Sequence, residues 1–178
     1  WIEAISAYLS DAISKLADRG STVCTWTVGW DKIRNTFARF ALPISWDFAE
    51  SVAIEDSTGG YLGALDWIGR YIEHAMNASR ISPSPMVRRE SAIKLAEASS
   101  FAKGFDVVLT DPPYYDAIPY SDLMDFFYIW LRRSLFGLSP SFDAAFSSSL
   151  APKWDHTDND GELIDDSSRH EGDKERSK

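Results

Sequence analysis

The sequence predicts an α/β fold with a helix-rich amino-terminal half, and three features of its hydrophobic pattern support this prediction. Val107–Leu109 is a short β-branched apolar run, typical of a strand buried on both faces of a parallel sheet. After this run, apolar side chains recur at steps of three and four, which indicates an amphipathic helix. Stretches with the same helical spacing occur earlier, within residues 1–80. The apolar face of the helix after the strand comprises Leu123, Phe126, Phe127, Trp130, Leu131 and Leu135.

A stiff bend follows the predicted strand. Pro112 and Pro113 have no N–H for a β-ladder, and each pushes its predecessor toward extended geometry, so the strand stops at Asp111. Ligands bind at the carboxyl ends of the strands in open α/β sheets. The bend, which Tyr114 completes, is therefore the predicted site. In the structural alternative it is a plain turn, with Tyr114 and Tyr115 covering a core edge.

The helix after the bend carries signals at both ends. Asp122 is suited to cap its start, and Gly137 is suited to end it. Arg132 and Arg133 fall in the last turn, where positive charge stabilises the helix dipole. Upstream, Met86–Leu95 is predicted to form a strand followed by a loop.

The amino-terminal half is predicted to be mostly helical. Trp1–Asp18 and Leu62–Ala78 carry apolar residues at helical spacing, and Asp31 is suited to cap a short helix over Lys32–Phe40. Ser21–Trp30 is rich in Thr, Val and Trp and fits either a strand or a connector. The stripe expected to be buried on the first helix consists of Ile2, Ile5, Leu9, Ile13 and Leu16.

Arg34, Asn35 and Arg39 form a polar and basic cluster on the predicted short helix. Arginine on a helix can contact phosphate or an extruded base. A solvated helix face is the interpretation favoured for these residues.

Length and composition indicate a single domain with an appended tail. The 178 residues are 44% hydrophobic, enough for one sizeable core. Residues 1–150 form the predicted domain, with a helical part at 1–80 and the strand–bend–helix unit at 86–137. Residues 151–178 are predicted to form a polar, acidic, mobile tail. The abrupt beginning and end of the sequence are those expected of a piece of a longer protein.

Charge and cysteine content restrict the class of protein. The net charge is −9, of which −5 lies between Asp155 and Lys178, so phosphate binding by this chain alone is disfavoured. Cys24 is the single cysteine, which excludes an internal disulfide and fits a reducing cytoplasmic location. No apolar run approaches the roughly 20 residues of a membrane span.

The motif Asp111-Pro-Pro-Tyr114 after an apolar strand resembles the catalytic motif of S-adenosylmethionine-dependent amino methyltransferases. The longer run Thr110–Arg133 is similar to a group of large prokaryotic adenine-specific DNA methylases, and Arg34–Arg39 and Leu42–Glu50 resemble a second block of that group. The resemblance implies a Rossmann-like methyltransferase domain that methylates an exocyclic amino group in DNA, most simply that of adenine.

The chemistry explains why such an enzyme needs these residue types. An aromatic amine is a poor nucleophile because its lone pair is delocalised into the ring. Hydrogen bonds from the amino group to the Asp111 carboxylate and the Pro112 carbonyl would hold the nitrogen toward tetrahedral geometry and stabilise its developing charge. Tyr114 would stack on a base extruded from the duplex.

The resemblance assigns a role to each candidate site residue. No metal site is expected from the residues. Asp111, Pro112, Pro113 and Tyr114 are the catalytic candidates. Tyr114 and Tyr115 are the candidates for substrate binding. Ser91, Ala92 and Asp111 are the candidates for contacting the cofactor, S-adenosyl-L-methionine.

A complete enzyme of this kind also needs a glycine-rich turn after its first strand and an acid at the end of the second strand. Neither occurs in this sequence. The expected partners are therefore DNA and the remainder of the polypeptide, or a companion subunit, that carries the glycine motif. The alternatives are an RNA or guanine amino methyltransferase, or a module that binds nucleic acid or protein without turnover.

Overall fold

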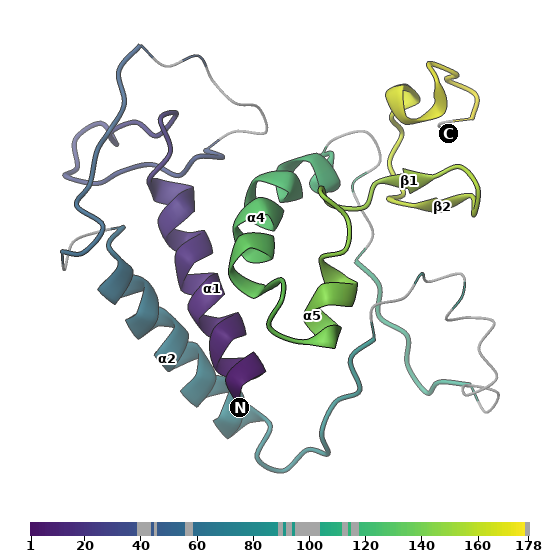
Figure 1. Cartoon of the computed structure of the whole chain (residues 1–178), viewed down its shortest axis with the longest axis horizontal. Helices are drawn as coiled ribbons and strands as arrows, with labels where there is room; N and C mark the ends of the chain where they lie inside the picture. Colours follow the sequence, from purple (N-terminus) through teal and green to yellow (C-terminus); the bar gives the residue numbers. More distant parts are fainter. Residues whose placement is uncertain are drawn as a thin grey trace. The chain divides into compact units, whose positions relative to one another are not determined.

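The computed structural model describes residues 1–38, 44, 46–55, 59–88, 91, 94, 104–111, 114 and 118–176 (Figure 1). The chain divides into two compact units, the first comprising residues 1–82 and 125–150 and the second comprising residues 83–124 and 151–178. The predicted division, by contrast, separated residues 151–178 from all that precedes them. The elements in chain order are α1 (Ile2–Arg19), α2 (Tyr61–Ala78), α4 (Tyr120–Leu135), α5 (Pro140–Ala145), β1 (Trp154–Asp155), β2 (Asp160–Gly161) and the 3₁₀ helix η2 (Ser167–His170).

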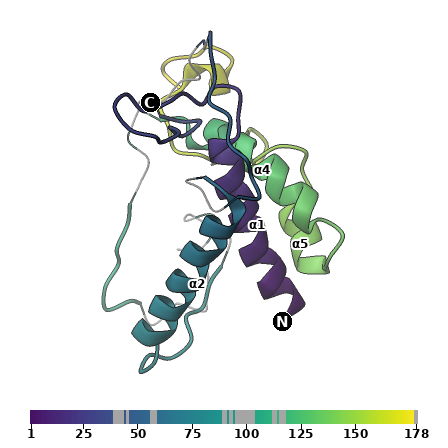
Figure 2. The same cartoon turned by 90° about the vertical axis from the view of Figure 1, so that its left-hand side faces the viewer.

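In the first unit, α1 and α2 lie side by side (Figures 1 and 2). Both helices match their predicted ranges to within one residue at each end. The stripe expected to be buried on α1 is only partly covered, because Ile2, Ile5 and Leu9 are 75%, 54% and 41% exposed. The fully buried residues of α1 are instead Ser10 and Ala12, which shows that α1 makes its closest contacts through small side chains.

The predicted helix over residues 32–40 is wrong for its described part. Trp26 and Ile33 form an antiparallel bridge, with backbone hydrogen bonds from Thr27 N to Lys32 O and from Arg34 N to Thr25 O, each 2.8 Å. These bonds use the backbone groups that a helix would need, so tertiary pairing overrides the local helical spacing. For residues 21–30, left open between strand and connector, the structure gives a turn with this single bridge.

The core of the first unit next to this turn is small. Cys24, Ile33 and Ala49 form one buried cluster, and Ala49 N donates to Cys24 O at 2.9 Å. Thr36, 1% exposed, lies against the end of α1. Its backbone nitrogen and its hydroxyl both donate to Asp18 O at 2.7 Å, so one of the carbonyls left unpaired at the end of α1 is satisfied.

The helix α4 was predicted, but its start differs from the prediction. It begins at Tyr120, so Asp122 lies in the first turn and is not the cap. The first turn belongs to the second unit, and the remainder of α4, from Asp125, belongs to the first. Gly137, with a φ of +87°, follows the helix in a left-handed conformation that favours glycine, as its stop role predicts.

The first unit continues with α5, which the sequence did not predict. Ser139 caps α5 by accepting a hydrogen bond from Phe142 N. The Tyr128 hydroxyl donates to Ser148 O at 2.9 Å, and the Arg132 side chain donates to Phe146 O at 3.0 Å. The segment after α4 is thereby folded back along that helix.

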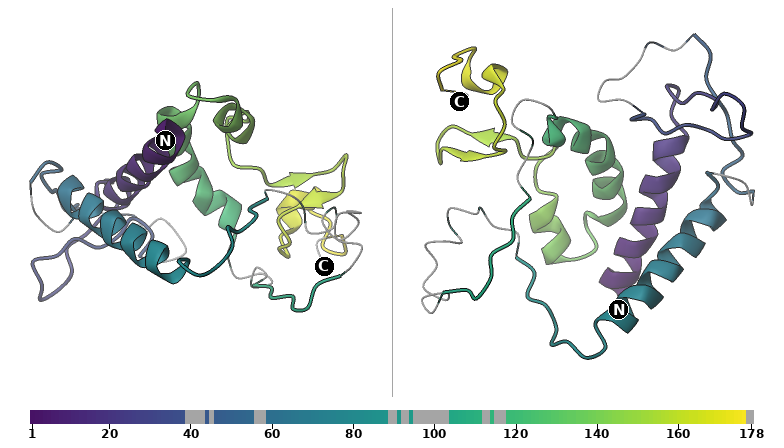
Figure 3. Two further views of the ribbon diagram at one scale, coloured as in Figure 1. Left: turned by 90° about the horizontal axis from the view of Figure 1, so that it is seen from below. Right: turned by 180° about the vertical axis from the view of Figure 1, so that it is seen from behind.

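The strand predicted at residues 107–109 is not formed. Residues 104–111 carry no β-pairing, and Val107, Val108 and Leu109 are 70%, 70% and 92% exposed. A strand gains its hydrogen bonds only from a neighbouring strand, and none lies beside this run within the described residues. The sheet that the described residues do form is the two-stranded antiparallel hairpin β1–β2 (Figure 3). The Rossmann-like fold and the strand predicted within residues 86–95, which are only partly described, therefore remain predictions.

The helices of the described ranges are too short or too polar to cross a lipid bilayer.

Candidate functional site

The residues predicted to carry the chemistry are exposed where the structure describes them. Asp111 lies on the surface, and Tyr114 is 62% exposed. Pro112, Pro113 and Tyr115 lie outside the described residues. The two described ends of the bend are thus exposed to solvent. The geometry that the two prolines impose stays a prediction.

Of the two residues predicted on the cofactor side, Ser91 is described and Ala92 is not. Ser91 Oγ donates to Asp160 Oδ1 at 2.9 Å, although 69 positions separate the two residues. Ser91 lines an open pocket of about 900 Å³. The remaining lining residues are Lys94, Pro152–Asp158, Asp160 and Gly161.

The pocket is lined by three aspartates, Asp155, Asp158 and Asp160, and by two lysines, Lys94 and Lys153. Lys94 Nζ lies 3.2 Å from Asp158 Oδ2 and 3.8 Å from Asp160 Oδ2. The hydrogen bond and the charge of Asp158 raise the pKa of Lys94. The pKa of Asp155 is lowered because its carboxylate accepts backbone hydrogen bonds from Thr157 and Asp158. These carboxylates favour a ligand that donates hydrogen bonds or carries positive charge, and they disfavour a phosphate.

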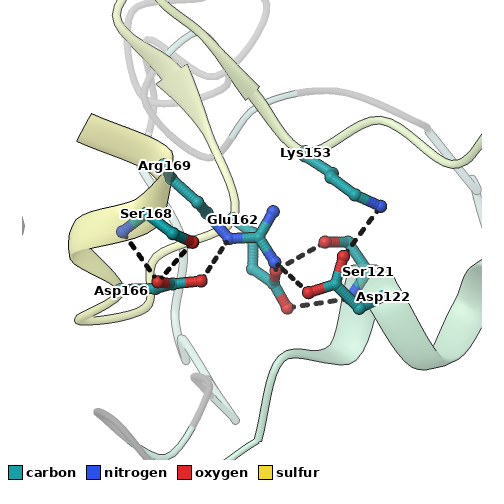
Figure 4. A network of polar contacts seen from close by, with 7 residues as sticks. All are labelled: Ser121, Asp122, Lys153, Glu162, Asp166, Ser168 and Arg169. Carbon is teal, nitrogen blue, oxygen red and sulfur yellow. Dashed lines mark hydrogen bonds and ion pairs between the residues drawn. The ribbon is translucent and has the colours of Figure 1, made fainter. Parts of the chain in front are cut away.

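A denser polar network lies in the second unit, between the first turn of α4 and the carboxyl-terminal segment (Figure 4). Glu162 accepts hydrogen bonds from Ser121 N at 3.0 Å and from Ser121 Oγ at 2.7 Å. Arg169 Nη2 lies 3.0 Å from Glu162 Oε2 and 3.1 Å from Asp122 Oδ2. Lys153 Nζ reaches the other oxygen of Asp122 at 2.9 Å.

The network continues onto the 3₁₀ helix η2. Asp166 caps η2, with its Oδ1 accepting from Ser168 N at 2.9 Å and from Ser168 Oγ at 2.7 Å. Its other oxygen lies 3.4 Å from Arg169 Nε, close enough for an ion pair but outside hydrogen-bond geometry. The hydrogen bond from Ser168 is the main reason why the pKa of Asp166 is lowered, and the nearby Arg169 charge adds to it.

Nothing in the local sequence pattern had singled out this network. Ser121 and Asp122 belong to the predicted helix after the bend, where Asp122 was expected only as a cap, and the other members lie in the segment expected to be mobile. Only Asp166 and Arg169 have the local spacing of three positions that brings side chains together on a helix. The contacts between Ser121 and Glu162 span 41 positions. Such a pair is invisible to any pattern within one element.

Of the predicted polar and basic cluster, for which a solvated helix face was favoured, Arg34 and Asn35 are described. The Asn35 side-chain amide donates to the Asp18 carboxylate, and Thr36 beside it is buried against the end of α1. Arg34 is exposed, and Arg39 lies outside the described residues. Asn35 and Thr36 therefore bind the carboxyl-terminal end of α1 through hydrogen bonds to Asp18. The sequence had not suggested this role.

The described histidines do not form a metal site. His170, 7% exposed, packs its ring against Trp154 with centroids 5.0 Å apart, and His156 lies 6.0 Å from it. Within the described ranges, no three His, Cys, Asp or Glu side chains are grouped as metal ligands would be.

The chain was compared with protein-family models, curated proteins and solved structures. No protein-family model matches the chain, and searches of curated proteins and of solved structures returned no similar protein.

Proposed function

We propose that this chain supplies the amino-group-binding part of an S-adenosylmethionine-dependent DNA methyltransferase acting on adenine. The observation that carries the proposal is the sequence Asp111-Pro-Pro-Tyr114 between the apolar run Val107–Leu109 and the amphipathic helix α4. The exposure of Asp111 and Tyr114 leaves both side chains accessible to a base that has left its duplex.

In this proposal the chain's own residues hold and polarise the amino group. The Asp111 carboxylate and the Pro112 carbonyl accept hydrogen bonds from the –NH₂ and favour the positive charge that grows on nitrogen. Tyr114 stacks on the base, an interaction worth roughly 1–3 kcal/mol. No general base is required before the nitrogen attacks.

The described residues do not fit the cofactor by themselves. The pocket beside Ser91 has several carboxylates and a lysine that already pairs with two of them. A sheet with a glycine turn, which would hold the adenosyl group, is not formed by the described residues. We therefore assign the cofactor site to the remainder of the polypeptide or to a companion subunit.

The exposed apolar run supports the assignment of the cofactor site to another part of the protein or to a companion subunit. Val107, Val108 and Leu109 are at least 70% exposed, and covering each would contribute roughly 1.5–3 kcal/mol. Their β-branched or apolar side chains suit a strand once neighbouring strands are present. A sheet supplied by the cofactor-binding part would cover the run and fix Asp111 at its edge.

A contact between aromatic rings also agrees with the proposal. The Phe37 ring lies 5.5 Å from that of Phe126 and 5.8 Å from that of Phe127. The two sequence blocks that resemble the methylases, one around residues 34–39 and the other within 110–133, thus meet in the first unit.

The decisive experiment measures methyl transfer from labelled cofactor to DNA by the complete gene product. Asp111→Ala should abolish incorporation while leaving cofactor affinity largely unchanged, because the carboxylate acts on the amino group in the transition state. Asp106→Ala is the matched control, since Asp106 is an exposed aspartate in the same segment. Equal turnover in the Asp111 variant and the control would remove Asp111 from its role.

A non-catalytic module that binds nucleic acid or protein is the second candidate. The unpaired run at residues 107–109 favours it, since such a run also suits pairing with a partner's strand. In that case the unmodified protein would bind its partner while transferring no methyl group to DNA, RNA or free bases.

A further inference from the structure

We infer that residues 151–170 form a clasp on the first turn of α4, in which Glu162 and Arg169 are positioning residues for the Asp111–Tyr114 bend. The inference deepens the proposed function and, for its catalytic consequence, rests on it. The residues of the clasp and the first turn of α4 belong to the same compact unit.

The first step of the argument is the unpaired backbone at the start of α4. The first amide groups of a helix have no partner within the helix. Glu162, 41 positions further along the chain, is the partner of one of these amides. Its carboxylate accepts hydrogen bonds from the backbone N–H and the hydroxyl of Ser121. Ser121 is 8% exposed and the Glu162 side chain 10%, so water is largely kept from these bonds. The negative charge also lies at the positive end of the helix dipole.

The second step is the fixing of Glu162 itself. Arg169 has a side chain only 6% exposed, and its Nη2 contacts both Glu162 and Asp122 (Figure 4). One guanidinium group thereby ties the carboxylate of the clasp to a carboxylate of α4. Lys153, immediately before β1, holds the second oxygen of Asp122. The first turn of α4 is thus held by contacts at two consecutive residues, Ser121 and Asp122.

The third step connects these contacts to the bend. Tyr120, the first residue of α4, follows Tyr114 by six positions, a distance the chain spans in at most about 20 Å. A first turn of α4 that is fixed in place therefore limits how far from it Tyr114 can lie, and fraying of that turn would increase the number of residues between Tyr114 and the fixed part of α4.

Hydrogen–deuterium exchange in the complete protein tests the clasp without any need for activity. Glu162→Ala should accelerate exchange of the amides of residues 120–123 at least tenfold, since a buried hydrogen bond to a charged acceptor is lost. Glu162→Gln keeps the shape of the side chain and can still accept from Ser121 N. Its exchange rate should therefore lie between those of the unmodified protein and Glu162→Ala. Glu171→Gln, a charge-matched change at an exposed residue just past η2, should leave exchange unaltered.

The kinetic arm tests positioning. In Glu162→Ala we expect kcat for methyl transfer to fall at least tenfold with the KM for cofactor unchanged, and Glu162→Gln should recover part of the loss. Unaltered exchange in Glu162→Ala would overturn the clasp, and faster exchange with unchanged kcat would overturn the positioning role. Failure of the proposed function is distinguishable, because then the unmodified protein transfers no methyl group.

Discussion

The ring of Phe37 meets the ring of Phe126 edge to face, with centroids 5.5 Å apart and planes at 84°. Phe126 in turn meets Phe127 at 5.1 Å, so the three rings form one cluster. The contact joins the segment after α1 to α4. It gives the aromatic face of α4 a packing role, as the sequence had indicated.

Phe37→Ala should therefore destabilise the first unit by about 1–3 kcal/mol, less than a fully buried phenylalanine because Phe37 is only half-buried. Urea unfolding followed by circular dichroism measures the change. Phe48, which is 46% exposed, provides the control, and Phe48→Ala should cost no more than about 0.5 kcal/mol. Equal losses in both variants would show that the ring cluster contributes nothing specific.

Thr36→Val should cost about 1–2 kcal/mol, because it removes a buried hydroxyl that donates to Asp18 O at 2.7 Å and contacts Ser21 Oγ at 2.8 Å. The two side chains have nearly the same shape, so the change isolates the hydrogen bonds from packing. Thr22→Val at an exposed position is the matched control. A stability equal to that of the control would mean that the hydroxyl does not hold the end of α1.

The sequence pattern predicted α1, α2 and α4 because the hydrogen bonds of a helix are local. The apolar spacing of residues 62–78, for example, is sufficient to locate α2 to within one residue. The predictions of a strand at 107–109 and, for its described part, of a helix at 32–40 were wrong for the opposite reason, because both outcomes depend on contacts that are not local. A strand needs a partner that spacing cannot supply, and the bridge between Trp26 and Ile33 outweighs the helical preference of the residues after it.

The candidate site shows the same limit. The motif at Asp111–Tyr114 is readable because it is contiguous, and the structure describes only its two ends. The link between Ser91 and Asp160, and that between Ser121 and Glu162, join segments that carry no shared pattern. The polar composition predicted a mobile tail, whereas the side chain of Arg169 in that segment is only 6% exposed.

The hairpin β1–β2 depends on Gly161. Its φ is +153°, and a Cβ at this position would overlap the carbonyl oxygen of Lys153 and lie 2.8 Å from Trp154 Cα. Gly161→Ala should therefore destabilise the hairpin by at least about 1 kcal/mol, seen as faster exchange of the Glu162 amide, which bonds Lys153 O at 3.0 Å.

Gly69→Ala is the opposite case, because Gly69 lies inside α2 with open space around it. Alanine there should raise stability by about 0.5–1 kcal/mol in urea unfolding. A loss of stability would show that something packs against this face of α2.

Acid should loosen η2 through Asp166. Its pKa is lowered in the folded chain, chiefly by the hydrogen bond from Ser168, so the ionised form stabilises the fold. That contribution is complete above the unfolded pKa, near 4, and is lost as the pH falls through the lower folded value. The protection factor of the Ser168 amide, which compares its exchange with that of an unstructured peptide at the same pH, should fall between pH 6 and pH 3 in the unmodified protein. In Asp166→Asn, whose side chain is uncharged at both pH values, this fall should be absent. An unmodified protein with no change between these pH values would contradict this.

Tyr114 separates stacking from hydrogen bonding in the proposed reaction. Its ring is 62% exposed, so neither variant below should disturb folding, and differences in activity report on the substrate. Tyr114→Phe should retain activity, since only the face of the ring is needed, whereas Tyr114→Ala should weaken the interaction with DNA by roughly 1–3 kcal/mol. Methyl transfer to an oligonucleotide, measured over a range of DNA concentrations, gives both the activity and the strength of the interaction with DNA. Equal defects in the two variants would instead assign the contribution to the phenolic hydroxyl, and Tyr114 would then be a hydrogen-bonding residue rather than a stacking platform.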